Sequence, residues 1–340
     1  MADKNILVTG GAGFIGSNFI PYLLETNPSA HIVNLDLLTY AGDLSNLKEI
    51  ENNPSYTFVK GDICDYVFIE KLFDTYDFEG VFHFAAESHV DNSISGPKAF
   101  IETNITGTFN LIEVARNKWM EDSFKIKKGY EENRFHHVST DEVYGTLGKT
   151  GLFSEQTPYA PNSPYSASKA SSDFLVRSYF HTYGMNVVTT NCSNNYGPKQ
   201  HDEKLIPTII RKALNNEAIP IYGDGKNVRD WLYVLDHCIG IELAFKTGKA
   251  GETYNIGGKN ERDNLYIVAK ICSILDNKQP NLDGKSYKEL ISFVKDRPGH
   301  DQRYAIDATK IESELNWKAG ENFESGILKT VDWYLQKYKN

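Results

Sequence analysis

The sequence predicts an α/β protein in which a doubly wound parallel sheet carries helices on both faces and a smaller mixed lobe follows toward the C-terminus. Short β-branched and aromatic segments alternate with helical patterns through about the first 190 residues. Most of these segments are apolar on both faces, as strands buried in a parallel sheet are. After residue 192 the alternation gives way to loops rich in Asn, Gly, Pro and aromatic residues, which predicts the second lobe.

The predicted strands are short runs bounded by turn residues. They are Ile6–Thr9, His31–Asp36, Tyr56–Gly61, Val81–Ala85, Arg134–Ser139, Asn186–Asn191 and Thr253–Ile256. His83, His136 and His137 interrupt the apolar pattern. Nothing beside them supplies metal-ligand spacing, so we interpret them as buried, hydrogen-bonded structural residues. The segment Glu121–Glu132 mixes Lys and Glu and predicts a solvated surface loop.

Charge and cysteine content exclude several classes of function. The formal net charge of -9 disfavours non-specific binding to nucleic acid or to an anionic membrane surface. The four cysteines are far apart and show no CxxC spacing, so we expect neither a metal site nor a disulfide framework: Cys64, Cys192, Cys238 and Cys272. No stretch of about 18 apolar residues occurs, and we expect a protein of the reducing cytoplasm.

A glycine pattern between the first strand and the first helix indicates a dinucleotide site. Gly10, Gly13 and Gly16 precede or open a helix that starts near Phe14, where free N–H groups and the helix dipole favour a pyrophosphate. A tight turn alone would also use glycines. Asp36, which closes the second strand twenty residues beyond Gly16, supplies the confirming context. An acid there accepts hydrogen bonds from ribose and repels a 2'-phosphate, so the sequence predicts a Rossmann-type domain that binds NAD rather than NADP.

Two further strand ends should border the cofactor, because ligands of such folds lie outside the carboxyl ends of the strands. Asp62 and Ile63 follow the third strand and are expected near the adenine. Ala85 and Ala86 end the fourth strand and are expected against the cofactor. For Asp62 a role as a helix N-cap is an equal alternative.

Tyr165 and Lys169 are four residues apart on a predicted helix that Ser163 caps and Pro164 begins. This spacing places both side chains on one face. A lysine cation beside a phenol should lower the pKa of the phenol, so that tyrosine serves as a base near neutral pH. A lone YxxxK could instead be a surface pair, and the dinucleotide motif upstream favours the catalytic interpretation.

Thr140, Asp141 and Glu142 directly follow the fifth strand. Two adjacent carboxyls beside a hydroxyl suit an elimination of water, in which a protonated acid releases hydroxide and an ionised one removes a carbon-bound proton. The alternative is an Asp-Glu pair that caps a helix start. If Asp141 is the acid, its pKa must be raised by burial and by Glu142.

Taken together, the chain resembles the extended short-chain dehydrogenase/reductase family, and within it the nucleotide-sugar 4,6-dehydratases. The resemblance covers essentially the whole chain through VTGGAGFIGSNF, NLDLLTYAGDLSNL, FHFAAESHVDNSI, VSTDEVYG, PYSASKASSD, NCSNNYGPKQ, EKLIP, PIYGDGKNVRDWLYV, YNIGG and DRPGHDQRYAID. The glycine pattern and YxxxK are family-wide, whereas TDEVYG, AAESHVD and DRPGHD are typical of the dehydratases. The chain departs from the family in a longer segment, Trp119–Asn133, and in Leu37-Leu38.

The resemblance implies two sets of ligand contacts. Contacts with NAD are implied for Phe14, Ile15, Asp36, Thr39, Asp62, Ile63, Thr103, Tyr165, Lys169 and Asn195. Contacts with the nucleotide sugar are implied for Ser88, Thr140, Asn194, Lys204, Leu205, Pro220, Tyr222, Arg229, Asn264, Arg297 and His300. Arg229 and Arg297 can pair with the diphosphate in an otherwise acidic protein.

The implied activity is the 4,6-dehydration of dTDP-glucose with NAD, and the implied assembly is a homodimer through helices Tyr165–Tyr183 and Pro97–Lys118. We expect residues 1–192, joined by 233–257, to bind NAD, and residues 193–232 and 258–340 to bind the nucleotide sugar. Three alternatives remain. A 4-epimerase needs no eliminating acid, a GDP-mannose 4,6-dehydratase more often uses NADP, and a non-catalytic NAD-binding regulator would not keep the catalytic residues.

Overall fold

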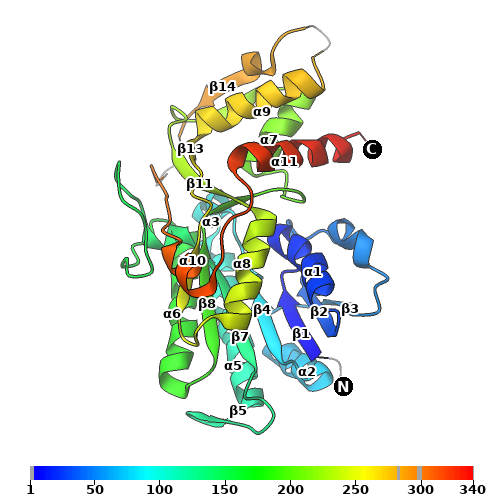
Figure 1. The fold of residues 1–340 in the computed structure, drawn as a ribbon, viewed down its shortest axis with the longest axis vertical. Coiled ribbons are helices and arrows are strands. Elements are labelled where there is room, and N and C mark those ends of the chain that lie inside the picture. Colours follow the sequence, from blue (N-terminus) through cyan, green and yellow to red (C-terminus); the bar gives the residue numbers. More distant parts are fainter. Residues whose placement is uncertain (1–3, 282–283, 297–300, 340) are drawn as a thin grey trace.

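The computed structural model describes residues 4–281, 284–296 and 301–339. Within these residues seven strands form one parallel sheet in the order β12-β8-β7-β4-β1-β2-β3 (Figure 1). Each predicted strand is present, with ends that differ by at most two residues. The strands are β1 (Lys4–Thr9), β2 (Ala30–Asp36), β3 (Tyr56–Lys60), β4 (Gly80–His83), β7 (Arg134–Thr140), β8 (Val187–Cys192) and β12 (Thr253–Ile256). The predicted fold class is therefore confirmed.

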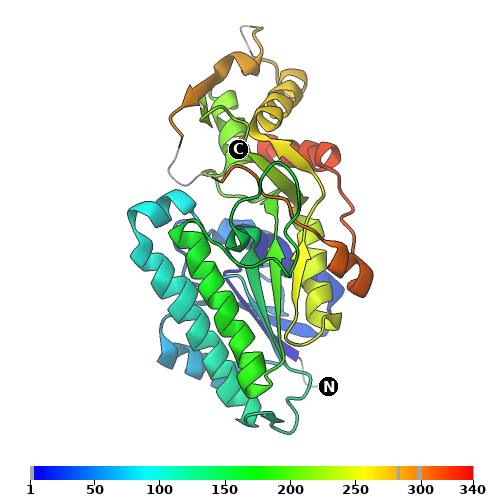
Figure 2. The same cartoon turned by 90° about the vertical axis from the view of Figure 1, so that its left-hand side faces the viewer.

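Helices cover both faces of this sheet (Figures 1 and 2). One face packs against α1 (Phe14–Thr26), α8 (Val234–Thr247) and α10 (Thr309–Leu315), with Phe19, Ile241 and Trp317 in its core. The other packs against α2 (Tyr66–Tyr76), α5 (Thr108–Trp119) and α6 (Pro164–Tyr183). The strand order reverses between β1 and β4, which is where ligands bind in open α/β sheets.

The second lobe has its own apolar core, in which Tyr196, Ile271 and Tyr334 are buried. It contains a three-stranded sheet in the order β13-β11-β9 and a parallel pair, β10-β14. Its elements are β9 (Asn194–Tyr196), α7 (Leu205–Leu214), β10 (Ile219–Tyr222), β11 (Val228–Tyr233), β13 (Glu261–Asp263), α9 (Asn264–Lys278), the 3-10 helix η4 (Tyr287–Leu290), β14 (Ile291–Val294) and α11 (Phe323–Lys337). β12 lies between these segments in sequence yet pairs with β8 of the large sheet.

The predicted helix Pro97–Lys118 is interrupted by a π-helical segment. It consists of α4 (Pro97–Phe100), the π-helix η2 (Ile101–Gly107) and α5, and it follows α3 (Val90–Ser95). A Cβ at Gly107 would lie 2.5 Å from Ile63 Cδ1, so the glycine lets this helix approach the end of β3 closely. π-Helical segments are frequent at functional sites. Hydrophobic periodicity does not report them.

The segment Glu121–Glu132 is largely exposed, as the sequence predicts, but it is not only loop. β5 (Met120–Asp122) and β6 (Lys125–Ile126) pair as a short antiparallel hairpin with Phe124 exposed at its tip. Strands of two or three residues are too short to show an alternating pattern. The remaining 3-10 helices are η1 (Leu44–Ile50) and η3 (Asp141–Tyr144).

The three strand histidines are buried and hydrogen-bonded, as predicted. His83 lies 2.7 Å from Thr9 Oγ1 and 2.9 Å from Thr108 Oγ1. His136 and His137 have partners in Thr190 and Asp173. Burial holds the pKa of each imidazole well below its usual range, so all three are neutral near pH 7. In the described part of the chain, no helix is both long enough and apolar enough to cross a bilayer.

Candidate active site

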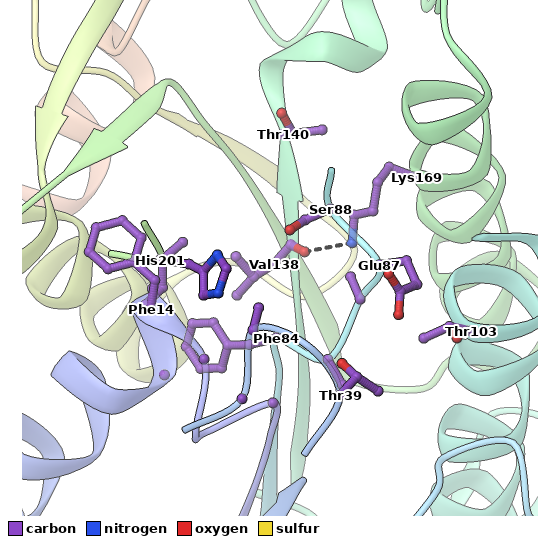
Figure 3. Close-up of a pocket in the computed structure, with 18 of the residues that line it drawn as sticks. Phe14, Thr39, Phe84, Glu87, Ser88, Thr103, Val138, Thr140, Lys169 and His201 are labelled. Atoms are coloured by element: carbon purple, nitrogen blue, oxygen red, sulfur yellow. Dashed lines mark hydrogen bonds between the residues drawn. The ribbon is translucent and has the colours of Figure 1, made fainter. Parts of the chain in front are cut away.

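One cleft opens at the carboxyl ends of β1, β2, β4 and β7 (Figure 3). All residues predicted to be catalytic line it: Thr140, Asp141, Glu142, Tyr165 and Lys169. All residues predicted to contact the cofactor line it as well: Gly10, Gly13, Phe14, Ile15, Gly16, Asp36, Thr39, Asp62, Ile63, Ala85, Ala86, Thr103, Tyr165, Lys169 and Asn195. The structure thus brings together motifs from widely separated parts of the chain, and their individual roles stay predictions.

The glycine turn leaves no room for a side chain at Gly10 or at Gly16. Gly10 has a φ of +71°, and a Cβ there would lie 2.6 Å from Ala85 N. A Cβ at Gly16 would lie 2.5 Å from Gly10 O. α1 begins just after Gly13 without a side-chain cap, so its first N–H groups face the cleft and can bind an anion.

Asp36 is fixed at the end of β2 by the backbone. Its Oδ2 accepts a hydrogen bond from Ala12 N at 2.9 Å, and its Oδ1 accepts one from Leu38 N at 2.8 Å. A carboxylate oxygen accepts more than one hydrogen bond, so both oxygens can still receive ribose hydroxyls. The glycine turn and this held carboxylate together fit NAD.

Asp62 does not cap α2. That helix is capped by Asp65, which accepts a hydrogen bond from Phe68 N at 3.0 Å, whereas Asp62 accepts one from Cys64 N within its own turn. The N-cap alternative for Asp62 is therefore wrong, and its place in the cleft agrees with the ligand interpretation. Asn195, which also lines the cleft, donates to Ser193 O, while its Oδ1 is buried with no partner among the described residues. Such an atom suits a bound ligand.

Tyr165 and Lys169 lie on one face of α6. Ser163 is the N-cap and Pro164 occupies the first turn, as the sequence predicts, and Ser163 also forms a capping box with Ser166. Lys169 reaches across to β7, where its Nζ donates to Val138 O at 2.9 Å (Figure 3). Both side chains are at most 9% exposed.

The predicted direction of the tyrosine pKa is wrong for the chain alone. Burial and then the charge of Glu142 raise the pKa of Tyr165 well above 10, although a hydrogen bond from Thr140 opposes this. Burial lowers the pKa of Lys169 to about 8, and Asp173 opposes that change. Phe100 contributes to the burial of the phenol, because its ring packs edge-on against that of Tyr165 with 6.3 Å between the ring centroids. Sequence spacing shows the lysine but not this environment.

Asp141 has the environment that an acid needs. It is 2% exposed, and burial followed by Glu142 and Asp230 raises its pKa well above the usual range, while Arg229 opposes the shift. Its Oδ2 has no hydrogen-bond partner among the described residues. Thr140 caps the short helix η3 by accepting from Glu142 N at 3.3 Å, so the acidic pair does not act as the cap.

The residues predicted to hold the nucleotide sugar are divided. Ser88, Thr140, Asn194 and Lys204 line the cleft, and Lys204 Nζ donates to Ser88 O at 3.3 Å. The others in the described part of the chain lie outside its lining, on β10, β11 or at the starts of α7 and α9: Leu205, Pro220, Tyr222, Arg229 and Asn264. Arg297 and His300 lie outside the described residues.

Arg229 is buried within the second lobe. Its guanidinium donates to Val228 O at 2.8 Å and to Asp301 O at 2.9 Å, and it lies over the Tyr304 ring at 4.3 Å. The side chain therefore contacts residues 301–304, which lie before α10 in sequence. Its predicted contact with a diphosphate stays a prediction.

Sequence reasoning missed several residues that line the cleft. Glu87 lies between two predicted contacts, Ala86 and Ser88, and Glu203 precedes Lys204. Burial and the charge of Glu203 raise the pKa of Glu87. Cys192 ends β8, so the rule on strand ends would have found it had the predicted strand been one residue longer.

Comparison with known proteins agrees with this site. The family model for GDP-mannose 4,6 dehydratase matches residues 7–330. A dTDP-glucose 4,6-dehydratase of Xanthomonas campestris pv. campestris (strain B100) is 56% identical over 329 residues, which cover 97% of this chain and 92% of the relative. The dTDP-glucose 4,6-dehydratase 1 of Escherichia coli (strain K12) is 53% identical, with coverage of 98% and 93%.

Solved structures separate activity from fold. The dTDP-glucose 4,6-dehydratase of Bacillus anthracis str. Ames, crystallised with NAD, has a TM-score of 0.85 at 44% identity and covers 99% of this chain and 98% of its own. That of Streptomyces venezuelae, crystallised with NAD and a dTDP ligand, has a TM-score of 0.87 at 42% identity, with 98% coverage of each chain.

A UDP-glucose 4-epimerase of Thermotoga maritima reaches a TM-score of 0.85 at only 28% identity, covering 98% of this chain and 99% of its own. The backbone is thus common to both activities, and the higher identities fall on the dehydratases. The chain belongs to the family that the GDP-mannose 4,6 dehydratase model describes and, within it, to the dTDP-glucose 4,6-dehydratases.

Proposed function

We propose that this chain is an NAD-dependent dTDP-glucose 4,6-dehydratase, a hydro-lyase that forms dTDP-4-keto-6-deoxy-glucose and water. One observation carries the proposal: Asp141, buried with a raised pKa, lies beside Glu142 in the cleft that Tyr165 and Lys169 also line. The relatives at 52% to 56% identity with this activity support it. A 4-epimerase would have no use for a protonated carboxyl at this place.

NAD would be held by the glycine turn, Asp36 and Asn195. When bound, it supplies a positive ring that accepts a hydride and later returns it. Burial and the charge of Glu142 raise the pKa of Tyr165, so its deprotonation depends on positive charge and hydrogen bonds in the cleft. Lys169 is charged below about pH 8, and Thr140 donates to the phenol oxygen.

The reaction follows from the order of these groups. Tyr165 takes the proton of the sugar C4 hydroxyl as the C4 hydride leaves, and the resulting ketone makes the C5 proton acidic. Glu142 removes that proton, and Asp141 protonates the departing C6 hydroxyl, so water is lost. The hydride then returns to C6 and a proton to C5. Because the hydride leaves and returns within one turnover, no net oxidation occurs.

We also propose a homodimer formed through α6 and the α4-η2-α5 helix. Exposed apolar side chains on these helices support it: Ile101 at 47%, Phe109 at 41% and Phe174 at 58% exposure. Sedimentation of Phe174→Glu should show a loss of dimer if this face is the interface. The proposed lobes are 1–192 with 233–257 and 193–232 with 258–340. Two apolar cores support this division, except that α10 and Trp317 pack in the core of the large sheet. The four unpaired cysteines support a reducing cytoplasm.

The proposed reaction is tested by incubating the protein and NAD with dTDP-glucose deuterated at C4 and following the sugar by NMR. A new C6 methyl signal that carries the deuterium is expected, because the hydride removed from C4 returns to C6. Deuterium that stays at C4 with inverted configuration would show an epimerase instead. An unchanged sugar would refute dTDP-glucose as the substrate.

A further inference from the structure

A buried carboxylate outside the proposed catalytic set lies close to it. Asp173 is four residues after Lys169 on α6 and 5% exposed. Its Oδ2 accepts hydrogen bonds from Ser139 Oγ and Tyr159 OH, both at 2.9 Å, and its Oδ1 lies 3.0 Å from His137 Nε2. An ionised carboxylate only accepts, so His137 Nε2 carries the proton. Asp173 therefore has three donors, two from β7 and one from the loop that carries Tyr159.

Two of these donors flank the residue that holds Lys169. His137 and Ser139 project to the same face of β7, and between them Val138 O accepts from Lys169 Nζ at 2.9 Å. Consecutive residues of β7 are thus tied to one turn of α6. The next residue along the strand is Thr140. These hydrogen bonds therefore fix Tyr165 and Lys169 on α6 relative to the Thr140–Glu142 segment at the end of β7.

Among neighbouring groups, Asp173 also has the strongest electrostatic effect on Lys169. The titratable groups that face Lys169 are Tyr165 and Asp173 from α6, His137 from β7, His83 from β4 and Cys192 from β8. The histidines and the tyrosine are neutral near pH 7, and burial raises the pKa of the Cys192 thiol to about 12. Burial raises the pKa of Asp173 only to about 6, so it alone in this group is an anion at pH 7.

We propose that Asp173 is a positioning residue of the reaction, which fixes Tyr165 and Lys169 against the Thr140–Glu142 segment and keeps Lys169 protonated. The inference rests on the proposed function. It goes beyond a structural role, because the charge of Asp173 reaches the reacting groups through Lys169. A buried carboxylate that served only folding would affect stability and leave the pH dependence of the oxidation step unchanged.

The test compares Asp173→Asn with its parent in an Asp141→Asn background, where elimination is blocked and NADH reports C4 oxidation directly. The rate of NADH formation at saturating dTDP-glucose should fall at least about tenfold at pH 8, with little change in KM. In the pH profile of the rate of NADH formation, the fall at alkaline pH (the alkaline limb) should move to lower pH by on the order of one unit. The reason is that Lys169 loses the opposite charge of Asp173, which favours its protonated form. Asp173→Glu should restore most of that limb.

Two controls separate charge from packing. Asp236→Asn removes another buried carboxylate, which lies near the start of α8 and outside the cleft lining. This carboxylate accepts a hydrogen bond from Glu321 N. It should leave the pH profile unchanged. Tyr159→Phe removes one hydrogen bond to Asp173 but keeps the charge, so its rate should fall without a shift of the limb. Tyr159→Phe and Asp173→Glu also keep the test open if Asp173→Asn does not fold.

A second readout does not need turnover. The affinity for NAD, measured by calorimetry between pH 6 and 9, should fall as the pH rises, because Lys169 lines the cofactor cleft and loses its charge. This fall should begin at a lower pH in Asp173→Asn than in the parent. An Asp173→Asn profile equal to that of Asp236→Asn in both readouts would overturn the inference. A parent that binds NAD but never oxidises dTDP-glucose would instead refute the proposed function, and the NAD titration would still decide the role of Asp173.

Discussion

Asp141 and Glu142 are neighbours in sequence with different environments: Asp141 is buried at 2% exposure, whereas Glu142 is partly exposed, and its charge adds to the burial that raises the pKa of Asp141. The 3-10 helix η3 causes the difference, since successive side chains along it point about 120° apart. Burial thereby favours the protonated form of Asp141, whereas Glu142 keeps contact with solvent. Environments that separate two carboxyl pKa values in this way assign an acid and a base.

Replacing Asp141 by Asn should separate oxidation from elimination. The isosteric amide cannot protonate the C6 hydroxyl, so we expect product formation to fall roughly 10²- to 10⁴-fold while C4 oxidation continues. NADH should then accumulate and be visible by its absorbance after mixing with dTDP-glucose. Glu142→Gln, which removes the base, should give the same accumulation. Product formation at the parental rate by Asp141→Asn would show that another group is the acid.

Asp36 should set the preference for NAD. Asp36→Ala removes hydrogen bonds to a charged group, each worth about 1.5 to 3 kcal/mol, so NAD binding should weaken roughly 10- to 100-fold for each bond lost. NADP should be affected less, because its 2'-phosphate no longer meets a carboxylate. Asp43→Ala is the control: it removes a nearby carboxylate that caps η1 by accepting from Ser45 N. Titrations with both cofactors decide this, and an unchanged NADP to NAD ratio in Asp36→Ala would contradict it.

Gly16→Ala should damage the cofactor turn. The added Cβ would lie 2.5 Å from Gly10 O and 2.6 Å from Gly11 Cα, and backbone atoms cannot move aside as a side chain can. We expect a loss of about 1 to 3 kcal/mol in the free energy of unfolding, together with weaker NAD binding. Gly148→Ala, where a Cβ would meet nothing within 4 Å, should change neither quantity. Equal effects of the two substitutions in urea unfolding and NAD titration would count against the close approach.

Local signals in the sequence predicted much of this molecule. The capping pattern at Ser163, the acid that follows Gly16 by twenty residues and the polar cluster after β7 each depend on neighbours in the chain. Because parallel strands end at one edge of the sheet, these separate signals also predicted that their residues meet in one cleft.

Other properties depend on contacts between distant segments, and the sequence did not reveal them. Asp173 takes its partners from β7 and from the loop that carries Tyr159, so its role is visible only once α6 is packed on the sheet. The raised pKa of Tyr165 has the same origin, since it follows from burial and from Glu142 rather than from the lysine four residues away. The π-helical turn at Ile101–Gly107 likewise leaves no mark in the hydrophobic pattern.

His237 should make the protein sensitive to acid. It is fully buried on α8, neither ring nitrogen has a hydrogen-bond partner among the described residues, and burial lowers its pKa from 6.5 to about 3. Between these values the unfolded chain binds a proton at this residue and the folded chain does not. Stability is therefore present above pH 6.5 and is lost as the pH falls toward about 3, by about 1.4 kcal/mol per unit for one proton.

His237→Leu should remove that dependence and relieve two unsatisfied polar atoms, each of which costs about 1 to 3 kcal/mol when buried. We expect the variant to be more stable than the parent at pH 7 and to gain further on it as the pH is lowered from 6.5 to 4. Urea midpoints across this range measure the difference. His83, His136 and His137 are present in both proteins, so the difference isolates His237. Parallel stability curves would mean that the buried imidazole takes up its proton in the folded state.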